Sequence, residues 1–150
     1  MNICGIVAEY NPFHNGHKYQ IDLLRETGVT HIVAFMSGNF VQRGDIAVTD
    51  KFTRAKYAIE NGVDLVIEMP TLYTVASAHF YAKAAYSLMQ DIGCIDSVSF
   101  GCETSDIEIL KKAASFSEEV NESLEVKEKM SEGMSYPAAI ESLADDDISI

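Results

Sequence analysis

The chain of 150 residues is 47% hydrophobic and 23% charged, which suits one soluble domain with its own hydrophobic core. No run approaches the roughly 18 apolar residues of a membrane helix and no signal peptide is recognisable, so we expect a cytoplasmic protein without a membrane partner. Of the net charge of −12, residues 1–100 contribute −3 and residues 101–150 contribute −9. Phosphate affinity depends on Lys and Arg, so this composition excludes a strongly basic nucleic-acid-binding domain.

Short apolar runs alternate with helical patterns along the chain. Runs rich in Val and Ile predict strands at residues 3–8, 31–36, 65–69 and 97–100. Helical periodicity predicts helices at residues 18–26, 50–61, 75–90 and 105–116, with Asp50 as a candidate N-cap. The alternation predicts an α/β fold, a doubly wound, Rossmann-like parallel sheet with strand order 3-2-1-4-5.

The end of the chain departs from this alternation. From residue 117 the sequence is acidic and helical, and it closes with D-D-D-I-S-I. The last three residues are typical of a fifth strand that begins at Ile148. We therefore interpret residues 1–150 as a single domain, cut from a longer protein within its last strand; a frayed tail is the alternative.

Two histidines stand where the first strand gives way to the first helix, in E-Y-N-P-F-H-N-G-H-K, residues 9–18. Doubly wound sheets bind ligands beyond the carboxyl ends of their strands, and helix N-termini attract phosphate. His14 and His17 are three residues apart, so both imidazoles can face one phosphate, and Gly16 permits close approach of a ligand. A surface or capping pair is the alternative. No acidic or thiol side chain stands at a matching position, so we predict no metal site.

The string N-P-F-H-N-G-H resembles the H-x-G-H motif of the nucleotidyltransferase superfamily. The resemblance implies attack on the α-phosphate of ATP with loss of pyrophosphate, and Mg²⁺ is expected with the triphosphate. It assigns catalytic roles to His14, His17 and Lys18. Gly101, after the fourth strand, would face the histidine turn, where a side chain would block the nucleotide. The residues implied to bind ATP are Val7, Ala8, Glu9, Tyr10, Asn11, Pro12, Phe13, His14, Asn15, Gly16, His17, Lys18, Tyr19, Gln20 and Gly101.

Further strings narrow the resemblance. M-S-G-N-F-V-Q-R-G, D-K-F-T-R-A, G-V-D-L-V-I-E-M-P and S-F-G-C-E occur in that order. With the histidine motif they resemble the tRNA(Met) cytidine acetate ligase family from residue 1 to at least residue 105. This implies a ligase that uses ATP and acetate to form acetyl-adenylate and then acetylates N4 of the wobble cytidine of elongator tRNA(Met), giving N4-acetylcytidine. Weaker candidates for the acetate or RNA face are Ser37, Asn39, Gln42, Arg43, Lys51 and Arg54.

The family is longer than this chain and has a helical C-terminal region implicated in tRNA contact. We therefore expect residues 1–150 alone to bind ATP weakly and to acetylate tRNA poorly. K-M-S-E-G, at residues 129–133, resembles the second phosphate motif of the superfamily, but Glu132 would repel a triphosphate and we reject it. The alternatives are a metabolite adenylyltransferase, of the nicotinamide-mononucleotide or phosphopantetheine type, and a nucleotide-binding domain without catalysis. The sequence does not specify an oligomeric state.

Overall fold

The computed structural model describes residues 1–102, 104, 106–120 and 123–144, without the side chain of Arg43. The chain divides into two compact units, Met1–Gly101 and Cys102–Ile150. That the two form a single domain stays a prediction. Within the described ranges, every helix is too short or too polar to cross a membrane.

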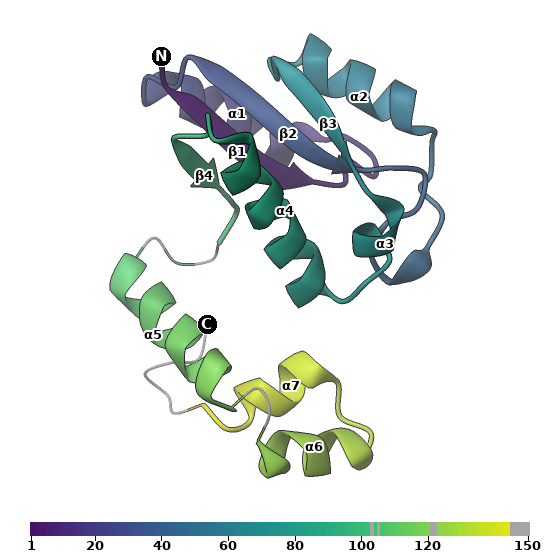
Figure 1. Cartoon of the computed structure of the whole chain (residues 1–150), viewed down its shortest axis with the longest axis vertical. Helices are drawn as coiled ribbons and strands as arrows, with labels where there is room; N and C mark the ends of the chain where they lie inside the picture. Colours follow the sequence, from purple (N-terminus) through teal and green to yellow (C-terminus); the bar gives the residue numbers. More distant parts are fainter. Residues whose placement is uncertain (103, 105, 121–122, 145–150) are drawn as a thin grey trace. The chain divides into compact units, whose positions relative to one another are not determined.

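The first unit is a parallel sheet with helices between its strands (Figure 1). Its strands have the order β3-β2-β1-β4, which confirms the predicted fold class and the first four places of the predicted order. The fifth strand, expected from Ile148, lies outside the described residues. The elements are β1 (Ile3–Ala8), α1 (Asn15–Glu26), β2 (His31–Ser37), η1 (Gln42–Gly44), α2 (Lys51–Glu60), β3 (Leu65–Met69), α3 (Thr71–Thr74), α4 (Ala78–Ile92) and β4 (Ser97–Ser99).

Most element boundaries agree with the sequence patterns to within a few residues. Asp50 caps α2 as predicted, because its carboxylate accepts the N–H groups of Phe52 and Thr53 at 2.9 and 3.0 Å. Two starts differ. Helix α1 begins at Asn15, three residues early, and α4 begins at Ala78 after the short helix α3, which the pattern did not separate.

Both faces of the sheet are covered. Side chains alternate along a strand, so β1 contributes to two cores. Cys4, Ile6 and Ala8 pack with residues of α1 and α2, such as Ile21 and Ala58. Ile3 packs with Tyr81, Ala85 and Met89 of α4. Because the four strands are parallel, their carboxyl ends lie at the same end of the sheet. Strands β1 and β4 flank the point where the strand order reverses.

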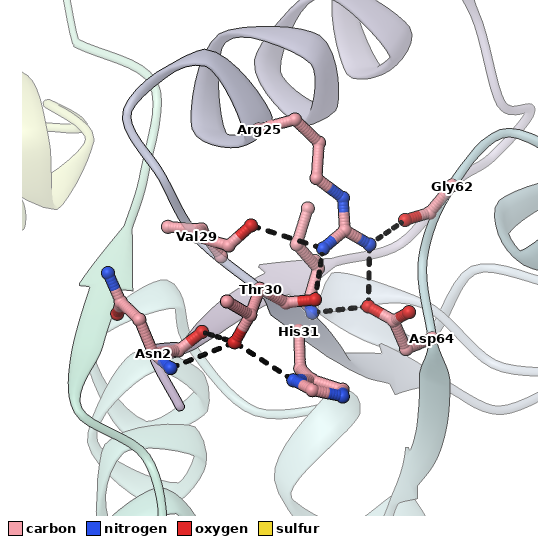
Figure 2. A network of polar contacts seen from close by, with 8 residues as sticks. Asn2, Arg25, Val29, Thr30, His31, Gly62 and Asp64 are labelled. Carbon is pink, nitrogen blue, oxygen red and sulfur yellow. Dashed lines mark hydrogen bonds and ion pairs between the residues drawn. The ribbon is translucent and has the colours of Figure 1, made fainter.

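At the opposite end of the sheet, where β2 and β3 begin, one guanidinium connects several segments (Figure 2). Arg25, in the last turn of α1, donates to Asp64 at 2.6 Å and to three main-chain carbonyls, those of Val29, Thr30 and Gly62, at 3.3, 2.6 and 2.7 Å. Asp64 also accepts the Ile32 N–H at 2.6 Å. Burial raises the pKa of Asp64, but the Ile32 N–H and the Arg25 side chain outweigh it, so the pKa lies below its usual value. The network fixes the starts of β2 and β3.

The described part of the second unit is helical. It comprises α5 (Ile107–Val120), α6 (Leu124–Ser131) and α7 (Tyr136–Glu141). The helix predicted at residues 105–116 thus extends to Val120. The K-M-S-E-G string lies at the end of α6, in the helical segment expected from the sequence.

Candidate active site

The two histidines of the motif cap the helix that they open. His14 is the N-cap of α1, with extended backbone, and its Nδ1 accepts the Gly16 N–H at 3.1 Å. His17 Nδ1 accepts the His14 N–H at 3.2 Å. The rings stack with centroids 3.8 Å apart and planes 27° apart. The pair therefore satisfies helix-terminal amides that would otherwise have no partner, and it does so with both rings side by side.

These hydrogen bonds assign the protons of both rings. A nitrogen that accepts an N–H carries no proton, so each neutral ring holds its proton on Nε2, across the ring from the backbone. Burial and the charge of His14 both lower the pKa of His17, which favours its neutral form. The first turn of α1 contains no acidic residue. The arrangement thus offers two Nε2–H donors beside a helix N-terminus, which suits an anionic ligand.

Gly16 provides room for the His14 ring. A Cβ at position 16 would lie 3.0 Å from Cε1 and 3.1 Å from Nδ1 of His14, closer than ordinary carbon contacts. The expectation from sequence was close approach of a ligand. The structure gives a second reason for a glycine, because any other residue would push the capping imidazole aside.

Tyr10 supports the histidine turn by packing beneath its rings in the protein interior. It is buried, and its φ of 48° is in the left-handed region, where a non-glycine residue is strained. Its ring packs edge-on against His17, with centroids 4.9 Å apart, and at a tilt of 51° against Phe13, with centroids 5.1 Å apart. Burial raises the pKa of Tyr10 to about 12, so the phenol is neutral. The rings of Tyr10 and Phe13 thus pack against His17 and support the histidine pair.

Glu9 and Asn11 connect the histidine turn to the loop between β2 and α2. Glu9 Oε1 accepts the Gln42 N–H at 2.8 Å, and Asn11 Oδ1 accepts the Val48 N–H at 2.8 Å. Both residues were expected to line the nucleotide. Their side-chain oxygens bind main-chain amides and so connect residues 9–11 to the loop that contains Gln42 and Val48. That both residues also line the nucleotide stays a prediction.

The weaker candidates for an acetate or RNA face divide into buried and exposed residues. Asn39 and Lys51 are near the surface: Asn39 accepts the Lys51 N–H at 3.1 Å, and Lys51 Nζ pairs with Glu68 at 2.6 Å. Ser37 and Arg54 are fully buried and bonded within the protein. Neither side chain reaches solvent, and a role for them at the acetate or RNA face stays a prediction. The side chain of Arg43 lies outside the described residues.

The remaining nucleotide candidates lie on both sides of the switch point. Gln20 Nε2 donates to Ser99 Oγ at 3.0 Å and so connects α1 to β4. A Cβ at Gly101 would meet nothing within 4 Å, so the space beyond β4 is open. Lys18 pairs with Asp22 along the exposed side of α1, and its catalytic role stays a prediction. An exposed i,i+4 pair is weak, so the lysine is free to turn toward an anion.

Tyr81 of α4, which was not among the candidates from the sequence, also belongs to this region. Its hydroxyl donates to the Ala8 carbonyl at 3.1 Å and lies 3.0 Å from Ser37 Oγ. The one available indication is general: a buried tyrosine hydroxyl requires a partner, and here the partner is the last residue of β1.

A doubly wound parallel sheet with paired histidines capping the helix at its switch point defines the class of H-x-G-H nucleotidyltransferases. The profile of the HIGH Nucleotidyl Transferase family matches residues 1–149, and the chain belongs to that family. This confirms the superfamily expected from the motif.

Similar proteins carry a common name. The tRNA(Met) cytidine acetate ligase of Clostridium kluyveri is 46% identical over 142 residues, which are 93% of this chain and 35% of the relative. That of Clostridium tetani is 47% identical over 146 residues, 94% of this chain and 36% of the relative. A crystal structure of Thermotoga maritima TmcAL bound with alpha-thio ATP superposes with a TM-score of 0.80 at 40% identity, over 95% of this chain and 35% of that one. The chain spans about a third of the length of these relatives.

Proposed function

We propose that the protein is an ATP-dependent ligase that adenylates acetate and acetylates the wobble cytidine of elongator tRNA(Met). An acetate oxygen attacks the α-phosphorus of ATP in line, the bond to the α,β-bridging oxygen breaks, and pyrophosphate leaves. The cytidine N4 amine then attacks the acetyl carbonyl carbon and loses a proton as AMP departs, giving N4-acetylcytidine. Adenylation is required because acetate alone has no leaving group that an amine can displace.

The observation that carries the proposal is the histidine pair that caps α1 at the switch point, in a chain 46% identical to a protein named tRNA(Met) cytidine acetate ligase. His14 and His17 would donate Nε2–H bonds to the crowded α-phosphate and to the leaving pyrophosphate. Such fixed donors, directed to where charge develops, are the main protein contribution to phosphoryl-type transfer. Lys18 would add charge after leaving Asp22.

ATP would extend from the histidine turn past Gly101, where the space above β4 is open. The alpha-thio ATP bound to Thermotoga maritima TmcAL supports an ATP site on this fold. Among residues 1–102, 104, 106–120 and 123–144 there is no cluster of three or more His, Cys, Asp or Glu arranged to hold a metal ion. Mg²⁺ would therefore be held mainly by the phosphates and water, as it usually is with triphosphates. We place the reaction in the cytoplasm, with its tRNA.

The first test is acetate-dependent exchange of labelled pyrophosphate into ATP, using the natural gene product in which these 150 residues occur. The Clostridium tetani relative is the positive control. We expect exchange with acetate and none with nicotinamide mononucleotide or phosphopantetheine. Turnover of a phosphorylated metabolite without acetate exchange would overturn the ligase proposal in favour of a metabolite adenylyltransferase. ATP binding without any exchange would favour a non-catalytic domain.

Substitution then tests the histidines. His14→Ala and His17→Ala should each abolish exchange while the protein stays folded, because each removes a donor to the phosphates. His79→Ala is the matched control, since His79 is an exposed histidine of α4 that is not part of the turn. Exchange at the wild-type rate in either turn variant would remove that histidine from the mechanism.

A further inference from the structure

Arg54 is a buried cation that binds main-chain carbonyls. It lies on α2 with 0% of its surface exposed. Its guanidinium donates to the carbonyls of Glu9 at 2.5 Å and Thr49 at 3.2 Å, and also to that of Gly38. Within the described part of the chain, Arg54 has no carboxylate within ion-pair distance. Burying a charge is costly unless hydrogen bonds compensate it, so these carbonyls account for its place.

The three carbonyls belong to three different segments. Glu9 follows β1, Gly38 follows β2, and Thr49 precedes α2. The planar guanidinium presents several donors in fixed directions, which lysine cannot reproduce. Arg54 therefore holds the histidine turn, the end of β2 and the start of α2 at fixed mutual positions.

Tyr81 holds the neighbouring carbonyl from the other face of the sheet. It is 6% exposed and packs in the core under α4. A carbonyl only accepts, so the Tyr81 hydroxyl donates to Ala8 at 3.1 Å, and Ser37 Oγ at 3.0 Å must then donate to Tyr81. Arg54 precedes Ala58, a residue of the opposite core, by one turn of α2. Two consecutive carbonyls, Ala8 and Glu9, are thus held from opposite faces.

The next residue is the strained one. Tyr10 has its φ at 48°, and a non-glycine residue in that region costs about 1–3 kcal/mol, so it persists only where its surroundings fix it. Its ring supports His17. Movement of the main chain at Ala8 or Glu9 would let Tyr10 relax and would carry the histidine pair with it.

We propose that Arg54 and Tyr81 are positioning residues, which hold the main chain at Ala8 and Glu9 from both faces so that His14 and His17 stay stacked at the switch point. Neither residue contacts the reacting atoms. The catalytic part of this inference rests on the proposed function, whereas the placement of the rings does not.

Conservative variants test the proposal. Tyr81→Phe removes one hydroxyl and keeps the ring, and Arg54→Lys keeps the charge but not the fork of donors. We expect kcat for pyrophosphate exchange to fall about a hundredfold, as misplacement of about 1 Å does, with KM for ATP changing less. We also expect the ring C–H resonances of His14 and His17 to shift in carbon–proton NMR spectra recorded without ATP, because stacked rings shield each other.

Two controls separate positioning from general weakening of the fold. Tyr86→Phe makes the same change at an exposed site of α4. Arg25→Lys weakens the guanidinium network at the opposite end of the sheet. Both should leave the exchange rate and the His14 and His17 resonances at wild-type values.

Unchanged kinetics and unchanged histidine resonances in Tyr81→Phe would overturn the proposal, even if Arg54→Lys does not fold. Equal losses of kcat in Arg25→Lys and Arg54→Lys would also overturn it, because the effect would then follow stability. If the wild-type gene product shows no exchange, the proposed function fails, and the histidine resonances alone decide the positioning role.

Discussion

Substituting Gly16 by alanine should separate stability from activity. The added Cβ would lie 3.0 and 3.1 Å from two atoms of the His14 imidazole, so the ring must move by a few tenths of an ångström or turn away. His14 is exposed, so solvent leaves room for it to turn. The clash would therefore be relieved by loss of the ring position and not by unfolding.

The energies of folding nearly cancel. Alanine stabilises a helical position by about 0.5–1 kcal/mol relative to glycine. Loss of the His14 cap costs about 0.5–2 kcal/mol, the usual range for a side-chain cap. The net change in the free energy of unfolding should lie within about 1.5 kcal/mol of zero. Activity has no such compensation, because a displaced imidazole would no longer face the proposed position of the α-phosphate, and a loss of about a hundredfold in exchange is expected.

The assay combines thermal unfolding, calorimetric binding of ATP and acetate-dependent pyrophosphate exchange on the same preparations. We expect a melting temperature close to that of the wild type, weaker ATP binding and a large loss of exchange. An alanine variant that binds ATP and exchanges pyrophosphate like the wild type would refute the idea that this glycine serves the His14 ring. A variant that loses activity only because it unfolds would refute the energy estimate.

Three further substitutions test other parts of the structure. Arg25→Met removes four partly exposed hydrogen bonds and should lower the free energy of unfolding by about 2 kcal/mol, since each bond contributes little where water can replace it. Chemical denaturation would measure this free energy, and a loss below about 0.5 kcal/mol, roughly half a typical hydrogen bond, would contradict the prediction. Asp64→Asn should make the free energy of unfolding depend less on pH in the acidic range. The pKa of the carboxylate is lowered in the folded state, so its full contribution to the free energy of unfolding is present above pH 3.8, its ordinary pKa, and is lost as the pH falls through the lower folded pKa. A variant whose stability falls with acid as steeply as that of the wild type would argue against this assignment. Gly101→Ala should leave the melting temperature unchanged, because the Cβ meets nothing within 4 Å, yet weaken ATP binding; unaltered affinity would place the nucleotide elsewhere.

The sequence predicted best what local patterns control. Alternation of apolar runs and helical periods predicted the parallel sheet and the order of its first four strands. Asp50 was recognisable as a cap because its short carboxylate reaches the first amides of its own helix. The start of α1 was placed at Lys18 because histidine is not among the usual capping residues. A capping pair was only the alternative interpretation of the two histidines, and the structure shows His14 as the N-cap.

What the sequence did not predict is controlled by distant contacts. Arg54 was a weak candidate for the acetate or RNA face, and its sequence neighbours do not reveal the carbonyls of Glu9 and Gly38 that bind it. Tyr81 was not among the candidates, because its bond to Ala8 joins residues 73 positions apart. Periodicity locates the buried side of a helix; it does not identify which polar group that side will meet.

The same distinction explains how the motif works. The H-x-G-H letters specify a reciprocal cap: one imidazole on each side of a glycine that has no Cβ to obstruct them. A cap of this kind could open any helix. We propose that it serves phosphate chemistry here because the chain before it is fixed, at Ala8 by a hydroxyl from one face of the sheet and at Glu9 by a guanidinium from the other. On this proposal the chemistry depends on residues that do not contact ATP, so substitution of Arg54 on α2 or of Tyr81 on α4 should lower the exchange rate.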